Sequence, residues 1–342
     1  MTFGLRRWIV CLIALVSSSA ALSHGMPVGS AAAPSTRVVY GLPTAPPGLP
    51  GGIEPYFALE RGFFKQEGLD VEIVPLPGSV TVVRALLSRQ VDIALTDPAT
   101  VFLAYANGAP IKIISGPVER ATDVVVAAGV ITSVADLRGK RFGISQPGGQ
   151  THNEVKLLAA KYGVNPDDIQ YLAIGGPVPR VDALLVNRVD ATSLTIAVVK
   201  PVLDAIDAGK VHVIASLGDE FPDLPTAYDI TRDDVIRERP AILSRLVRAD
   251  IRGYRWAAQN PDAAAQIVAK YIAGLDPALA ARGVREVSRY YGVNGGVSAA
   301  SVAGAQRLLV QLGILRGVID VNQIFTPQFV TLALGSLGVM PR

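Results

Sequence analysis

Hydrophobic and polar residues between positions 52 and 97 follow a pattern of short helices alternating with short strands. Residues 53–60 place apolar side chains at helical spacing, and Gly62 follows, which is typical of a helix closed by glycine. Residues 69–74 (LDVEIV) alternate apolar with acidic positions, as a strand with one buried face does. The pattern therefore predicts a helix followed by a half-buried strand.

The same alternation continues with a second helix and a second strand. Ser79 is expected to cap a helix, because a serine hydroxyl can accept a hydrogen bond from a free N–H of the first turn. The apolar face of this helix consists of Val82, Val83, Leu86 and Leu87. Residues 91–95 (VDIAL) then form a short strand. This is a βαβ arrangement, and sheets of this kind bind ligands beyond the carboxyl ends of their strands.

Two segments of this region carry a resemblance to a known family. Residues 62–73 (GFFKQEGLDVEI) and 85–96 (ALLSRQVDIALT) resemble motifs of the substrate-binding proteins of ABC importers for sulfonates, taurine, nitrate and thiamine-pyrimidine precursors. The resemblance covers most of residues 37–270 and includes residues 133–141 (SVADLRGKR). It implies an α/β fold of the type II periplasmic-binding-protein class, in which two α/β lobes joined by a hinge enclose a ligand cleft.

The sequence also repeats itself at an offset of 98 residues. Residues 183–190 (ALLVNRVD) echo residues 85–92 (ALLSRQVD), and a threonine stands near the end of each following strand, at Thr96 and Thr195. Chance produces such echoes in chains rich in alanine and leucine, but two lobes built alike also explain it, and we favour the second interpretation.

This interpretation sets the expected domain organisation. We expect residues 34–123 to form the first part of lobe 1 and residues 124–221 to form lobe 2. Residues 222–342 then return to lobe 1 and add C-terminal helices.

Residues 1–33 read as a secretory signal and its tail. Arg6 and Arg7 precede a short apolar run, and small residues follow as far as Ala33. The apolar run is shorter than the roughly 20 residues that span a bilayer, although a signal anchor stays open as an alternative. Cys11, the single cysteine, lies inside this run, so the exported chain is expected to have no disulfide and no cysteine nucleophile. We expect a protein of the periplasm or extracellular face.

Charge and motifs narrow the function further. The chain has 32 basic and 29 acidic residues, and without residues 1–33 the balance falls to +1, which argues against a nucleic-acid partner. Dinucleotide, P-loop and nucleophile-elbow motifs are not found in the sequence. Beyond residue 33 the histidines are His152 and His212, far apart in the chain. We therefore expect no cofactor, no metal site and no catalytic residue.

Ligand contacts are expected at helix starts and strand ends, because free N–H groups and helix dipoles there favour anions. Residues 146–150 (QPGGQ) form one such loop, ahead of a helix expected over residues 155–162. Closure of two lobes would exclude water from these groups. The candidates are Glu54, Tyr56, Ser79, Val80, Thr81, Thr96, Asp97, Gln150, Thr151, His152 and Thr195.

Three of these assignments have two interpretations. Asp97 precedes a proline and either caps a helix, which we favour, or faces the cleft, where it would repel an anion. Tyr56 either stacks on a ligand or belongs to the core, and the core is the better fit. The proline-rich residues 43–52 either line the cleft or form an ordinary connection.

The predicted function is capture of a small organic ligand and its delivery to a transmembrane ABC permease with a cytoplasmic ATPase. The ligand is either a sulfonate-, taurine- or nitrate-like anion or a heteroaromatic such as a thiamine precursor, and we expect a monomer. Few arginines stand in the candidate loops, which argues against multiply charged anions. One alternative is an enzyme like the pyrimidine synthase of thiamine biosynthesis, which relies on a cysteine-rich segment. Another is a sensing domain for a membrane partner.

Overall fold

The computed structural model describes residues 35–44, 49, 51–195, 200–272 and 275–341, all within one compact unit of residues 34–342. The leader expected over residues 1–33 and much of the proline-rich loop lie outside the described residues. Within the described ranges the strands are β1 Thr36–Leu42, β2 Leu69–Pro75, β3 Ile93–Thr96, β4 Ile111–Val118, β5 Val124–Ala128, β6 Arg141–Ile144, β7 Gln170–Ala173, β8 Ala191–Leu194, β9 Val211–Ser216 and β10 Ala227–Arg232.

Helices connect these strands and extend beyond the last of them. They are α1 Glu54–Glu60, α2 Phe63–Gln66, α3 Ser79–Leu87, α4 Pro98–Ala106, α5 Gln150–Lys161, α6 Pro177–Leu185, α7 Lys200–Asp207, α8 Leu217–Glu220, α9 Asp233–Glu238, α10 Pro240–Gln259, α11 Pro261–Tyr271, α12 Pro277–Ser288, α13 Ala299–Gln311, α14 Val321–Ile324 and α15 Gln328–Leu337. Short 3₁₀ turns occur at Val134–Leu137 and Pro166–Asp168. In the part of the chain that the structure describes, no helix combines the length and apolar character needed to span a membrane.

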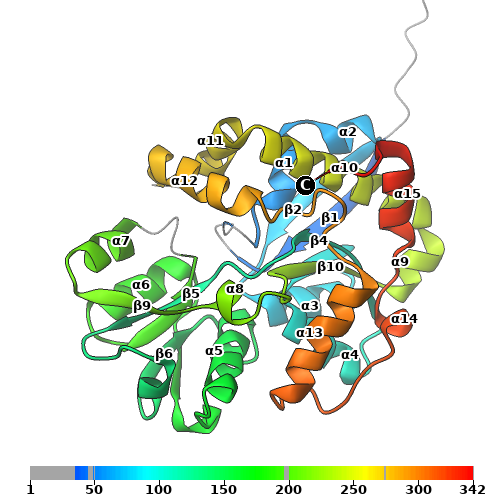
Figure 1. The fold of residues 1–342 in the computed structure, drawn as a ribbon. Coiled ribbons are helices and arrows are strands. Elements are labelled where there is room, and N and C mark those ends of the chain that lie inside the picture. Colours follow the sequence, from blue (N-terminus) through cyan, green and yellow to red (C-terminus); the bar gives the residue numbers. More distant parts are fainter. Residues whose placement is uncertain (1–34, 45–48, 50, 196–199, 273–274, 342) are drawn as a thin grey trace, which may run out of the picture. The chain divides into compact units, whose positions relative to one another are not determined.

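The strands form two five-stranded mixed sheets (Figure 1). The first has the order β2-β1-β3-β10-β4, and β10 runs antiparallel to both of its neighbours. The second has the order β7-β6-β8-β5-β9, and β5 is antiparallel to both of its neighbours. The chain leaves the first sheet after β4 and returns to it at β10, so residues 119–123 and 221–226 form two crossing segments between the sheets.

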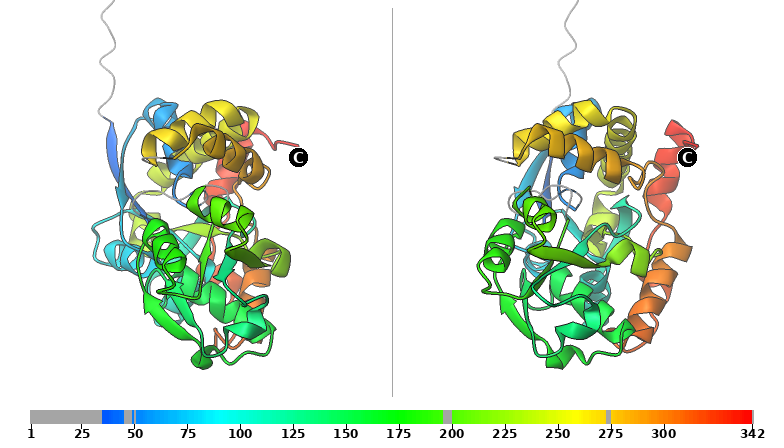
Figure 2. Two further views of the ribbon diagram at one scale, coloured as in Figure 1. Left: turned by 90° about the vertical axis from the view of Figure 1, so that its left-hand side faces the viewer. Right: turned by 60° about the vertical axis from the view of Figure 1, so that its left-hand side comes forward.

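Both faces of the first sheet are buried, and strand β3 shows how. Ile93 and Leu95 belong to the core formed with α1 and α10, whereas Ala94 between them packs in the core of α3 and α4. Successive side chains of a strand point to opposite faces, which explains the alternation. The helices assigned to these two cores lie on opposite sides of the sheet in Figures 1 and 2.

The second sheet is covered in the same way. Val155 and Leu158 of α5 pack with Phe142 in a core that continues into α4 and α13. Val181 and Leu184 of α6 pack in a separate core with strands β5 and β8. One hydrophobic core therefore passes from the first sheet to the second through α4, α5 and α13.

The internal echo corresponds to one local structure built twice. Arg89 and Asn187, 98 positions apart, both adopt left-handed backbone, with φ of 64° and 58°. Asp92 Oδ2 accepts a hydrogen bond from Val39 N (2.9 Å), and Asp190 Oδ2 accepts one from Arg141 N (2.8 Å). The expectation that the echo marks equivalent elements is confirmed.

Three local predictions are wrong. Ser79 is the first residue of α3 and not its cap, because Gly78 occupies the cap position with a φ of 92° that favours glycine. Leu87 does not join the apolar face of that helix and is 39% exposed. Helix α5 begins at Gln150, five residues before the expected start at Val155.

Candidate functional site

A cavity lies beside the two crossing segments. The space enclosed by its walls is about 380 Å³ when the open solvent at its mouth is counted. Its walls come from the start of α4, the first two turns of α5, both crossing segments and one residue of α13. The lining residues are Asp97, Pro98, Ala99, Ala121, Thr122, Asp123, Gln150, Asn153, Glu154, Leu157, Leu224, Pro225, Thr226 and Leu309.

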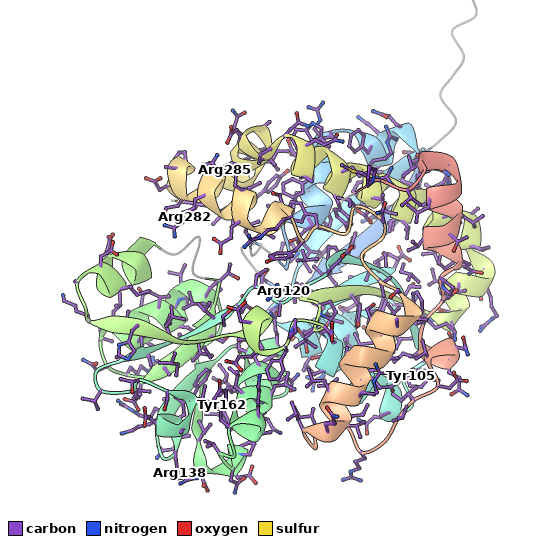
Figure 3. The ribbon with its side chains drawn as sticks, viewed as in Figure 1. Tyr105, Arg120, Arg138, Tyr162, Arg282 and Arg285 are labelled. Carbon is purple, nitrogen blue, oxygen red and sulfur yellow. The ribbon has the colours of Figure 1, made fainter. Side chains whose placement is uncertain are left out.

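Arg120, labelled in Figure 3, fixes the crossing segments next to this cavity. Its guanidinium donates to the carbonyl oxygen of Gly218 (2.7 and 3.0 Å) and to Asp219 Oδ1 (3.0 Å). Its own carbonyl oxygen accepts a hydrogen bond from Thr226 Oγ1 at 2.8 Å. The outgoing and returning chain are thus tied together at the cavity wall.

Asp97 caps α4, as the sequence led us to favour. Its Oδ1 accepts from the Thr100 N–H (3.0 Å), and Pro98 stands at the first helical position. Asp97 also lines the cavity, and contact of its carboxyl with a ligand stays a prediction. Asn153 Nδ2 of α5 lies 3.3 Å from Asp97 Oδ1 and donates to the carbonyl oxygen of Gly148 (3.1 Å), which links the starts of α4 and α5.

Two carboxyl groups in the cavity wall, those of Asp123 and Glu154, share one amide donor. Gln150 Nε2 donates to Asp123 Oδ2 and to Glu154 Oε1, both at 2.8 Å. Gln150 and Glu154 are four residues apart on α5 and so share a helix face, while Asp123 comes from the first crossing segment. One amide group therefore holds both carboxyls in place.

Asp123 and Glu154 form an acid pair, and hydroxyl groups donate to the other oxygen of each carboxyl. Thr195 Oγ1 donates to Asp123 Oδ1, and Ser193 Oγ donates to Glu154 Oε2. Burial raises the pKa of Glu154 well above its ordinary value, and the charge and hydrogen bond of the adjacent Asp123 raise that pKa further. The folded state therefore favours the protonated form of Glu154 more than the unfolded chain does.

Arg180 of α6 stands behind this pair and is 5% exposed. Its guanidinium donates to the carbonyl oxygens of Gly175 (2.5 Å) and Ser193 (3.1 Å). Burial lowers the pKa of Arg180, and the nearby charges of Asp123 and Glu154 oppose that change. The arginine thus partly balances the acid pair from outside the cavity lining.

The start of α3 holds three predicted contacts: Ser79, Val80 and Thr81. Turning the Gln146 amide so that its oxygen faces this helix lets it accept from Ser79 N (3.2 Å) and Val80 N (3.0 Å). The Gln146 side chain lies directly over Gly78, where an added Cβ would come within 2.2 Å of Gln146 Nε2. In that orientation the free N–H groups expected to attract an anion are bonded by a residue of the loop between β6 and α5.

Thr151 and His152 organise the loop before α5 and do not line the cavity. Thr151 Oγ1 accepts from Ser145 N (2.7 Å), and His152 Nδ1 accepts from Gly148 N (2.8 Å). The His152 ring meets Tyr171 edge-on at 4.4 Å, and burial lowers the pKa of this histidine. Both residues shape the loop between β6 and α5.

The remaining candidates lie in the first sheet and its helices. Glu54 is fully buried and accepts from the N–H groups of Gly51 and Gly52 (2.9–3.2 Å), while burial raises its pKa to about 7. Tyr56 packs against Tyr271 with ring centroids 4.0 Å apart, which fits the favoured core role. Thr96 is fully buried at the end of β3.

The structure thus brings three of the eleven predicted residues to the cavity region: Asp97 and Gln150 in its wall, and Thr195 behind Asp123. Ligand contact by any of the eleven stays a prediction. The sequence analysis missed Asp123 and Glu154. The spacing Gln150-x-x-x-Glu154 was visible, but placing the start of α5 too late concealed that the two residues share a helical turn.

Comparison with known proteins shows where the chain belongs. A family model described as NMT1/THI5 like matches residues 52–264, more than half of the chain. The chain belongs to this NMT1/THI5-like family. The family resemblance inferred from the sequence motifs is confirmed.

Named relatives of this NMT1/THI5-like chain include two bacterial binding proteins. It is 26% identical to a riboflavin-binding protein of Chloroflexus aurantiacus over 80% of this chain and 81% of that one. It is 25% identical to a formylaminopyrimidine-binding protein of Halalkalibacterium halodurans over 62% of this chain and 64% of that one.

A solved structure confirms the fold class. The periplasmic nitrate-binding protein of Synechocystis PCC 6803 superposes with a TM-score of 0.71 at 17% identity, covering 90% of each chain. Together with the two mixed sheets, this similarity confirms the expected two-lobed α/β fold. Across the described ranges, no group of three or more His, Cys, Asp and Glu side chains is placed to hold a metal ion.

Proposed function

We propose that this protein is the extracytoplasmic solute-binding component of an ABC importer. It captures a small organic molecule in the cavity at the crossing segments and delivers it to a transmembrane permease driven by a cytoplasmic ATPase. The observation that carries this proposal is that the wall combines the start of α4, which follows β3 of the first sheet, with α5, which follows β6 of the second. A ligand held there contacts both halves of the fold at once, and such contacts favour a closed state.

Fixed polar groups in the wall support binding over a purely structural cavity. Gln150 and Asn153 make hydrogen bonds that hold their amide groups in place, and apolar residues such as Leu157 and Leu224 fill the space between them. Ligand sites combine an apolar lining with a few placed polar groups in this way. No step of this function requires a reacting residue.

Two ligand classes were open from the sequence: sulfonate-, taurine- or nitrate-like anions and heteroaromatics. The names of the two bacterial binding proteins concern heteroaromatic compounds, riboflavin and a formylaminopyrimidine. Carboxyl groups in the wall also suit a ligand with hydrogen-bond donors better than an anion. The heteroaromatic class is therefore the better supported of the two.

The enzyme alternative has weaker support. A pyrimidine-synthase-like activity would rely on a cysteine-rich segment, and the sequence has the single cysteine Cys11, inside the expected leader. The named bacterial relatives are binding proteins. A role as sensor for a membrane partner would use the same cavity and the same ligand.

A thermal-shift screen tests the proposal directly. The purified protein is heated with riboflavin, aminopyrimidines, alkanesulfonates, taurine and nitrate in turn. A ligand that binds only the folded state stabilises it by RT ln(1 + [L]/Kd), about 2.7 kcal/mol at a hundredfold excess over Kd. A saturable shift with one class supports capture. Conversion of a compound to product, followed by mass spectrometry, would instead support the enzyme.

A further inference from the structure

The charged groups in the cavity wall are all acidic. Asp97, Asp123 and Glu154 contribute carboxyls, and the lining contains no lysine, arginine or histidine. Asp123 and Glu154 are 8% and 7% exposed, so water screens them poorly. An anion entering this space meets carboxyl groups of its own sign without a cation in the wall to offset them.

The acid pair is oriented by donors that hold it in one geometry. Gln150 Nε2 bonds both carboxyls at 2.8 Å, and Thr195 and Ser193 bond their other oxygens. Carboxylate oxygens can accept more than one hydrogen bond each. The pair is therefore a preorganised acceptor for N–H groups, and it needs little reordering when a donor arrives.

An independent feature of the wall also points to a ligand. Thr122, next to Asp123, lines the cavity, and its buried Oγ1 has no hydrogen-bond partner among the described residues. Buried hydroxyls without partners are uncommon, and a polar ligand group would supply the missing bond. Thr122 directly precedes Asp123, so the orphan hydroxyl lies one residue away from one member of the acid pair.

Neighbouring groups that would attract an anion lie outside the cavity lining. The first N–H groups of α3 are bonded by the Gln146 amide, once its oxygen faces that helix. Arg180 donates from its two terminal nitrogens to the carbonyl oxygens of Gly175 and Ser193, its buried Nε has no partner among the described residues, and it does not line the cavity. The charged groups of the lining itself are therefore carboxyls.

We propose that Asp123 and Glu154 are the specificity-determining residues of this cavity and select a nitrogen base with N–H donors over sulfonates and nitrate. The ligand class is an amine, an amidine or an amino-substituted heteroaromatic. Its N–H groups donate to the free acceptor positions of the two carboxyls, and Thr122 Oγ1 takes a further polar group. This inference rests on the proposed binding function and names its ligand class.

Titration calorimetry with two panels tests the inference. The nitrogen bases are benzylamine, benzamidine and 4-aminopyrimidine, and the anions are ethanesulfonate and nitrate. We expect at least one base to bind and the anions to fail. Asp123→Asn and Glu154→Gln keep the side-chain shape and replace one carboxyl oxygen acceptor by an amide NH₂ donor, and each should weaken base binding tenfold or more. Asp182→Asn, at an exposed carboxyl of α6, is the matched control and should change binding less than twofold.

The outcomes separate the two proposals. Binding of anions and not of bases would overturn the ligand class and leave solute binding intact. Base binding that both substitutions leave unchanged would likewise overturn the role of the acid pair. No binding in either panel, from protein with a cooperative unfolding transition, would overturn the proposed function itself. If Glu154→Gln fails to fold, Thr122→Val tests the same wall, and it should weaken base binding at least threefold.

Discussion

Two clusters of buried carboxyl groups in this protein have similar composition and different settings. The cavity cluster, Asp123 and Glu154 with their donors, lies beside the second sheet and lines the cavity. The core cluster lies between the first sheet and α10 and contributes no residue to that lining. All of its members are fully or almost fully buried. They are Tyr40, Glu54, Ser115, Asp229, Asp250 and Tyr254.

The two clusters satisfy their carboxyls differently. In the core cluster, Asp229 accepts from the Tyr40 hydroxyl and from Ser115 Oγ (2.8 Å). Both oxygens of Asp250 lack a hydrogen-bond partner among the described residues. In the cavity cluster, both oxygens of Asp123 and both of Glu154 are bonded.

Burial raises the pKa of carboxyls in both clusters, to about 6 for Asp229 and well above the ordinary value for Glu154. A buried carboxyl with a raised pKa therefore does not by itself mark a binding site in this fold. The cavity, and donors that hold the carboxyls toward it, distinguish the second cluster.

The largest expected effect concerns Asp229. Asp229→Ala leaves two buried hydroxyls without an acceptor and opens a cavity, so the free energy of unfolding should fall by about 3 kcal/mol. Urea denaturation at pH 7 measures this, with the exposed Asp182→Ala as control, expected within about 0.5 kcal/mol. A loss below about 1 kcal/mol would show that the core cluster contributes little to stability.

The next largest effect is a pH dependence of the free energy of unfolding, caused by Glu54 of the core cluster. Burial raises the pKa of Glu54 from 4.5 to about 7, so the folded state binds this proton more tightly than the unfolded chain. The stability from that proton is fully present below pH 4.5 and is lost as the pH rises to about 7, a change on the order of 3 kcal/mol.

Glu54→Gln removes the titrating group and should flatten the stability profile between pH 5 and pH 8. Urea denaturation at both pH values, on the parent protein and the variant, gives the two slopes. If stability changes equally with pH in the parent protein and the variant, Glu54 does not cause the pH dependence. Asp229 would then be the next residue to substitute.

A third prediction separates binding from stability. Gln150→Ala removes the donor shared by Asp123 and Glu154 and should lower nitrogen-base affinity about tenfold, equivalent to about 1.4 kcal/mol. Ser115→Ala in the core cluster should cost about 1 kcal/mol of folding stability and leave affinity unchanged. Calorimetry measures the affinity of both variants, and urea denaturation measures their stability. The prediction is wrong if both variants lose affinity and stability to the same extent.

The smallest effect is expected at Asp250. Both of its oxygens already lack partners, so the near-isosteric Asp250→Asn removes no hydrogen bond. We expect the free energy of unfolding to change by less than about 1 kcal/mol in either direction at pH 7. A loss as large as that of Asp229→Ala would reveal a bond to Asp250 that the static contacts do not contain.

Local sequence patterns predicted much of the fold because their causes are local. The Asp97–Pro98 pair predicted the start of α4, since an aspartate cap and a proline at the first helical position act within one turn. The echo at residues 85–92 and 183–190 predicted matching turns, which the paired left-handed residues Arg89 and Asn187 confirm. Helix α15, by contrast, was covered only by the general expectation of C-terminal helices within residues 222–342.

The sequence by itself determined the two-lobed α/β class, the family and several groups at helix starts and strand ends. Only the tertiary structure decided which of these groups meet. Asp123 and Glu154 are 31 positions apart, and the partner of the α3 start, Gln146, comes from the loop that follows β6 of the other sheet. Spacing along the chain carries no information about such pairs, because their contact depends on how two sheets pack and where each side chain then points.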